Sequence, residues 1–119
     1  MLEILFEDNH LIIVNKIPGD LSQGDITGDQ TLGDKVKTYL KKKYNKKGNV
    51  YLGIAHRLDR PTSGVIIFTK TSKALSRLNE FFKKNEIKKT YWAIVKSMTE
   101  KTPNKLVNYL IKNKKQNKS

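Results

Sequence analysis

The stretch HRLDRPTSGVIIFTKT, residues His56 to Thr71, joins a polar segment to an apolar one. Its polar half places two of the chain's three arginines, Arg57 and Arg60, on either side of Asp59, although lysine supplies most positive charge elsewhere. Its apolar half is a continuous β-branched and aromatic run, which predicts a buried strand. A polar loop that leads into a buried strand is held on a rigid scaffold, where catalytic residues are commonly found.

Apolar runs on both sides of this stretch extend the pattern. Residues 3–6 and 11–14 predict two strands around a polar turn at residues 7–10, and residues 50–55 predict a third that leads into the quoted stretch. Alternating side chains over residues 87–95 predict a further strand, followed by a polar turn at 99–104 and a short apolar piece at 106–111. Strands and helices without regular β-α-β alternation predict an α+β fold.

Two helices are expected between these strands. Thr31 followed by Asp34 has the pattern of a capping box, and Thr71 or Ser72 is expected to cap a second helix. Apolar side chains recur on one face of each helix; they are Leu32, Val36, Tyr39 and Leu40 in the first, and Leu75, Leu78 and Phe82 in the second. The opposite face of the first helix is rich in lysine, which is consistent with a solvated face or with phosphate contacts.

Composition limits the class of protein. A chain of 119 residues is one domain or part of one, and its net charge of +13 favours a nucleic-acid partner, with solubility as the alternative explanation. The chain has no cysteine and two histidines, so no metal site is expected. Neither a signal peptide nor a membrane span is evident, so a soluble cytoplasmic protein is expected. Residues 112–119, rich in lysine and asparagine, are expected to be disordered or a truncated end.

Asp59 is the strongest candidate for a catalytic residue in the quoted stretch. Guanidinium groups nearby would favour its ionised form, which can act as a base or a nucleophile. The alternative is a structural, ion-paired loop residue. Ser63 with His56 and Asp59 contains the residue types of a hydrolase triad, but the segment lacks the G-x-S-x-G elbow.

The stretch HRLDRPTSGVIIFTKT resembles the signature of the RluA-type family of RNA pseudouridine synthases, with an H-R-L-D core, then T-S-G, then an apolar strand ending in K-T. Three other segments are similar to the same family: LFEDNHLIIVNKIPGDLS, GDQTLGDKVKTYL and KKTYWAIV. The resemblance covers nearly the whole chain. It implies an α+β fold with a mixed, mainly antiparallel sheet and flanking helices.

The resemblance also implies a reaction. The family isomerises uridine in structured RNA to pseudouridine without metal or organic cofactor, and ribosomal RNA is expected ahead of transfer RNA as the substrate. Asp59 corresponds to the essential carboxylate, Arg57 to the arginine that takes the place of the flipped base, and Tyr91 to a tyrosine that packs on that base and is a candidate for proton transfer. Other motif residues, expected to shape the loop or bind RNA, are His56, Arg60, Thr62, Ser63 and Gly64.

The family's catalytic domain is longer than this chain. Its later part carries a His-Gln-Ile-Arg motif and a basic residue that pairs with the catalytic aspartate, and neither is found after Ile111. Residues 1–111 are therefore expected to be the N-terminal portion of such a domain, with self-association through an exposed sheet edge. The alternative function is a non-catalytic, basic RNA-binding fragment.

Overall fold

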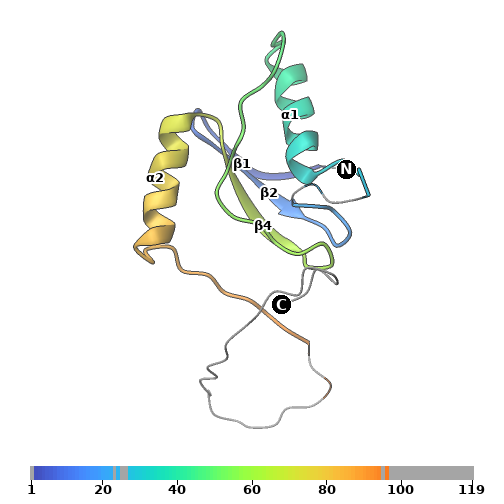
Figure 1. Ribbon diagram of the computed structural model, residues 1–119, viewed down its shortest axis with the longest axis vertical. Coiled ribbons are helices and arrows are strands. Elements are labelled where there is room, and N and C mark those ends of the chain that lie inside the picture. Colours follow the sequence, from blue (N-terminus) through green and yellow to red (C-terminus); the bar gives the residue numbers. More distant parts are fainter. Residues whose placement is uncertain (1, 23, 25–26, 95, 97–119) are drawn as a thin grey trace. The chain divides into compact units, whose positions relative to one another are not determined.

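The computed structural model describes residues 2–22, 24, 27–94 and 96 of the chain. Contacts divide the chain into two compact units, Met1–Lys88 and Lys89–Ser119. All the helices and strands described lie in the first unit (Figure 1). They are β1 (Glu3–Glu7), β2 (Leu11–Lys16), α1 (Leu32–Lys43), β3 (Gly53–Ile54), β4 (Gly64–Thr69) and α2 (Ser72–Lys83). Within the described part, neither helix is long and apolar enough to cross a membrane.

The four strands form one sheet in the order β1-β2-β4-β3, and every neighbouring pair is antiparallel. An isolated parallel bridge joins Leu21 to Thr31 outside these strands. In the central pair, Ile13 lies opposite Ile67 and Lys16 lies opposite Gly64. The predicted α+β class is confirmed, and this register brings the end of β2 beside the point where residues 56–63 enter β4.

Alternate residues of the two central strands build the core with α1. Because side chains alternate between the faces of a strand, one face of β2 and β4 is apolar and fully covered. The buried core side chains are Ile12, Val14, Leu32, Val36, Leu40, Val50, Ile66 and Phe68. Each contributes about 1.5–3 kcal/mol by leaving water. Figure 1 shows α1 and α2 on opposite sides of the sheet, so α2 covers part of the other face.

The starts of both helices follow the sequence prediction. Thr31 caps α1 with a complete capping box: its hydroxyl accepts from the Asp34 N–H, and the Asp34 carboxylate accepts from the Thr31 N–H, both at 3.0 Å. Thr71 caps α2, since its hydroxyl accepts from the Ala74 N–H at 3.1 Å. These bonds satisfy backbone donors that a helix start otherwise leaves open.

Both helices end with an asparagine in the left-handed region. Asn45 has φ 49° and Asn85 has φ 55°. After α1, the Lys46 N–H donates to the Lys41 carbonyl at 3.0 Å, which closes a Schellman-type end. Asparagine tolerates this backbone better than most residues with a side chain. The chain therefore leaves each helix in a defined direction.

Two predicted strands differ from the structure. Of the strand expected over residues 50–55, only Gly53–Ile54 is a strand. No strand forms over the described residues 87–94, where Trp92 is 97% and Ile94 104% exposed. Alternation alone cannot form a strand, because its backbone also needs a partner in a ladder. The features expected at 99–111 and 112–119 lie outside the described residues.

Candidate active site

Residues 56–63 form the loop that leads into β4, and Gly64 starts the strand. Gly64 has φ 149°, and a Cβ added there would lie 3.2 Å from Cδ1 of Leu58. Both the backbone conformation and the close approach favour glycine. Within the loop, the Thr62 N–H donates to the Asp59 carbonyl at 2.9 Å. The loop thus turns back on itself directly after Asp59.

The side chain of Lys16, from the end of β2, holds the backbone of this turn. Its side chain is fully buried, at 0% exposed, and its ammonium donates to the carbonyls of Arg60 at 2.8 Å and Thr62 at 2.6 Å. Burial lowers the pKa of Lys16, and the charges of Asp20 and Asp59 oppose that shift. A buried cation therefore holds the loop's backbone and interacts electrostatically with Asp59.

Lys16 was not among the residues predicted for the site. A signal for it exists in the sequence, because Lys16 follows Ile12 and Val14 at the same two-residue spacing on the buried face of β2. A lysine at a core position of a strand needs hydrogen-bond partners for its ammonium. The sequence alone does not show that those partners are the carbonyls of the loop.

Ser22 fixes the residue before Asp59. Its hydroxyl accepts from the Leu58 N–H at 3.0 Å and donates to the Leu58 carbonyl. Ser22 is buried, and Leu58 packs against the hydrophobic core. Both backbone groups of Leu58 are thereby satisfied by one side chain, which limits the directions in which the next residue can point.

Arg60 ties the loop to the segment between β2 and α1. Its Nε donates to the Gly19 carbonyl at 2.9 Å, and its Nη2 makes an ion pair with the Asp29 carboxylate at 2.9 Å. The Gly19 N–H donates back to the Arg60 carbonyl at 2.8 Å. The hydrogen bond from Arg60 lowers the pKa of Asp29. The guanidinium of Arg60 is thus engaged by Gly19 and Asp29, and its effect on the ionisation of Asp59 stays a prediction.

His56 connects the loop to β4 and α2. Its Nε2 accepts from the Ile67 N–H at 2.9 Å, and its ring centroid lies 5.1 Å from that of Phe82. An Nε2 that accepts this bond carries no proton and cannot also take one from a serine. The structure therefore argues against Ser63 and His56 as a nucleophile and base joined through that nitrogen. Contact of His56 with RNA stays a prediction.

The two central candidates, Arg57 and Asp59, are exposed. No side chain among the described residues donates a hydrogen bond to the Asp59 carboxylate. The backbone of Leu58, Asp59 and Arg60 is nevertheless fixed by hydrogen bonds. Thr62 is half-buried and Ser63 is exposed. The loop therefore presents Arg57, Asp59 and Ser63 to solvent, while Lys16, Ser22 and Arg60 determine its shape.

Tyr91 lies in the second unit, Lys89–Ser119, and its side chain is 65% exposed. Within the first unit, the structure brings the candidates of residues 56–64 together in one loop. The role of Tyr91 beside the target base stays a prediction.

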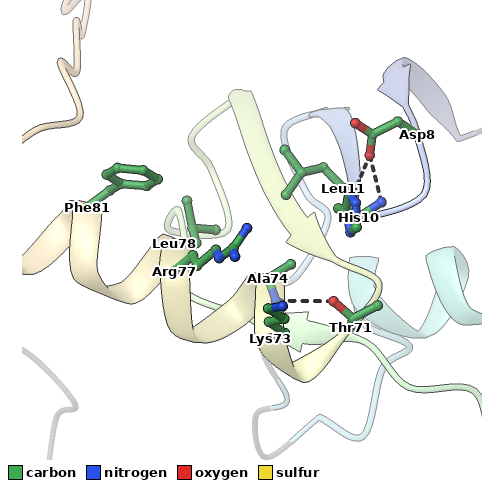
Figure 2. A pocket seen from close by; sticks show the side chains of 9 residues that line it. All are labelled: Asp8, His10, Leu11, Thr71, Lys73, Ala74, Arg77, Leu78 and Phe81. Atoms are coloured by element: carbon green, nitrogen blue, oxygen red, sulfur yellow. Dashed lines mark hydrogen bonds between the residues drawn. The ribbon is translucent and has the colours of Figure 1, made fainter.

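A pocket of about 430 Å³ is lined by residues outside this loop (Figure 2). Its lining comes from the β1–β2 turn, the start of β2 and α2, and consists of Asp8, His10, Leu11, Thr71, Lys73, Ala74, Arg77, Leu78 and Phe81. Leu11 pairs with Thr69 at the far end of β4 from Gly64. None of the predicted site residues lines this pocket, so it offers no substrate cavity beside Asp59.

Comparisons with known proteins identify the family. The family model described as RNA pseudouridylate synthase matches residues 10–119. An uncharacterised RNA pseudouridine synthase of Mycoplasma genitalium is 41% identical over 98 residues, which are 79% of this chain and 30% of that protein. The dual-specificity RNA pseudouridine synthase RluA of Haemophilus influenzae is 39% identical over 95 residues, 79% of this chain and 40% of that one.

A relative named for tRNA and a solved structure support the same family. The tRNA pseudouridine synthase C of Vibrio cholerae is 36% identical over 101 residues, 84% of this chain and 39% of that protein. The structure of human RNA pseudouridylate synthase domain containing 4 aligns with a TM-score of 0.59 at 25% identity, covering 71% of this chain and 30% of that one. The chain thus spans well under half the length of each of these proteins, and it belongs to the RNA pseudouridylate synthase family, with the RluA type among its relatives.

Proposed function

We propose that this chain supplies the aspartate loop of an RNA pseudouridine synthase that isomerises uridine in structured RNA, with ribosomal RNA ahead of transfer RNA as its substrate. The observation that carries the proposal is the exposed Asp59 carboxylate on a loop whose backbone is held by Lys16, Ser22 and Arg60. A catalytic group must be held in a defined position to act on a bound nucleotide.

The proposed reaction breaks the C–N glycosidic bond, rotates the uracil and forms a C–C bond between the same base and the same sugar, while the newly bonded ring carbon loses its proton and the freed ring nitrogen gains one. No atom is gained or lost. The target base leaves the RNA stack at a cost of a few kcal/mol. Asp59 acts on the extruded nucleotide, and Arg57 takes the place of the base, where its planar guanidinium stacks on neighbouring bases. Tyr91 packs on the extruded base.

The test is a map of pseudouridine in RNA from cells that carry Asp59→Asn in the complete gene and lack a redundant enzyme. We expect at least one site to disappear. Glu86→Gln is the matched control, because it removes one exposed carboxylate elsewhere in the same unit and should leave every site in place. Persistence of all sites in the Asp59→Asn strain would remove Asp59 from the mechanism.

A second candidate function is a basic RNA-binding fragment without catalysis. It is favoured by the net charge of +13 and by the small share of each relative that the chain spans. It predicts salt-sensitive RNA binding by the purified chain that survives Asp59→Asn, with no pseudouridine formed. Turnover by the purified chain would exclude it. We place either function in the cytoplasm, which fractionation of cells can check.

A further inference from the structure

Five exposed lysines lie on and just after α1, and together we call them the lysine face. It consists of Lys37, Lys41, Lys42, Lys46 and Lys47. With 3.6 residues per helical turn, Lys37 and Lys41 lie one turn apart beside the buried stripe of α1, and Lys42 lies further round the exposed side. The Schellman-type end of α1 then places the backbone of Lys46 beside Lys41. The lysine face is therefore attached to a helix whose position the core determines.

Other lysines of α1 form ion pairs, whereas the lysine face forms none within the part of the chain that the structure describes. Lys35 pairs with Asp20 at 2.8 Å, and Lys43 pairs with Glu7 at 2.9 Å. Among the described residues, no carboxylate makes an ion pair with a member of the lysine face; its one ring contact is Lys46 above Tyr44, at 5.9 Å. The charges of this face are thus not neutralised by the fold.

Stabilisation of the helix explains only part of this charge. Cations near the last turn interact favourably with the helix dipole, which accounts for Lys41 and Lys42. The effect falls off within one turn, so it does not account for Lys37. The second helix, α2, is also 12 residues long, yet its C-cap Lys84 lies 3.5 Å from the carboxylate of Glu80. Stabilisation of the helix therefore leaves the charge of Lys37 unexplained.

We propose that the lysine face binds the sugar–phosphate backbone of the substrate RNA at a distance from the target uridine. The proposal rests on the proposed function, which supplies the anionic partner. Lysine acts as a point charge toward phosphate and reads no base sequence, so the lysine face would add affinity and orientation rather than specificity.

The geometry places this contact away from Asp59. Glu7 joins the end of α1 to the end of β4 through Lys43 and Lys70, at 2.9 and 2.8 Å. The Asp59 loop enters β4 at its other end, Gly64, and a strand of this length spans roughly 17–20 Å. An RNA that reaches both places must extend over several nucleotides beyond the target uridine.

The test measures binding of the purified chain to a structured RNA over a series of salt concentrations. The variant carries Lys37→Gln, Lys41→Gln and Lys42→Gln together. Each lost phosphate contact should reduce the slope of log affinity against log salt by about 0.9, so the slope should become shallower by about 2–3. The matched control carries Lys73→Gln, Lys83→Gln and Lys84→Gln, which removes the same charge from exposed positions of α2 and at its end.

Equal loss of slope in the two triple variants would reduce the effect to net charge and overturn the proposal, as would an unchanged slope in the α1 variant. Thermal unfolding checks that both variants fold. If the α1 triple variant unfolds, Lys46→Gln with Lys47→Gln lies outside the helix and should still reduce the slope by about 1–2. Because the readout is binding, it separates from catalysis: Asp59→Asn should keep the full slope even if no pseudouridine forms.

Discussion

At the scale of single residues, Lys16 is the support on which the Asp59 loop depends. Lys16→Met keeps the length and apolar stem of the side chain but removes the ammonium, so the Thr62 carbonyl loses this donor and the Arg60 carbonyl keeps only the Gly19 N–H. Buried acceptors left without a partner cost about 1–3 kcal/mol, and we expect the free energy of unfolding to fall by that amount. Urea unfolding measures the loss, and faster hydrogen exchange at the Thr62 amide would show where it acts.

Glu7 makes the free energy of unfolding depend on pH. Burial raises its pKa, but hydrogen bonds from Lys70, Lys43, Tyr44 and Tyr39 outweigh burial and lower the pKa from 4.5 to about 2. Because the pKa is lower in the folded state, this stabilisation is present above about pH 4.5 and is lost as the pH falls towards 2. We expect Glu7→Gln to cost about 2 kcal/mol at pH 7, after allowance for solvent around its partners, and far less near pH 2.

The matched control for Glu7 is Glu80→Gln. Glu80 also pairs with a lysine, Lys84, but both side chains are more than half exposed, at 59% and 63%. Exposed pairs contribute about 0–1 kcal/mol. Urea unfolding at pH 7 and at low pH should therefore separate the two variants, and equal, pH-independent losses would refute the role assigned to Glu7.

Sequence and structure agree best where a residue acts locally. The position of Asp59 on a loop before a buried strand follows from the local pattern, and so does its exposure. The partners of Lys16 do not, because Arg60 and Thr62 lie 44 and 46 residues away in the chain. The same reason explains Arg60, whose guanidinium reaches Asp29.

At the scale of elements, the start of α1 is the simplest test of local coding. Thr31→Ala removes the hydroxyl that accepts from the Asp34 N–H and should cost about 1 kcal/mol. Thr31→Ser keeps the acceptor and should recover most of that loss. Denaturant midpoints for the two variants check the assignment, and equal destabilisation by serine and alanine would contradict it.

Caps could be predicted because both partners lie within one turn of the helix. The strand expected over residues 87–95 shows the opposite case, since the described residues 87–94 form none. A strand is completed by backbone bonds to a neighbouring strand, and the local pattern does not identify that neighbour. Gly53–Ile54 shows the same limit in a milder form: six residues with strand composition pair over only two. Local pattern thus predicts which residues favour a strand and leaves open how many pair.

At the scale of the molecule, the described sheet has two edge strands, β1 and β3. Phe6 on β1 is 48% exposed, and exposed apolar edges favour pairing with another chain. We expect the apparent mass in light scattering to rise with protein concentration, and Phe6→Lys to suppress that rise. Val65→Lys is the matched control, since Val65 is 54% exposed but lies on the internal strand β4. Equal suppression by both variants would indicate non-specific hydrophobic association rather than pairing through the edge strand.

The support of the Asp59 loop also bears on protein engineering. HRLDRPTSG looks like a self-contained cassette, yet its path is set by an ammonium, a hydroxyl and a carbonyl from Lys16, Ser22 and Gly19. A transplant of these nine residues into a foreign scaffold would bring the carboxylate without its geometry. The smallest unit that could be moved intact is discontinuous, and it must include residues 16–31 together with residues 56–64.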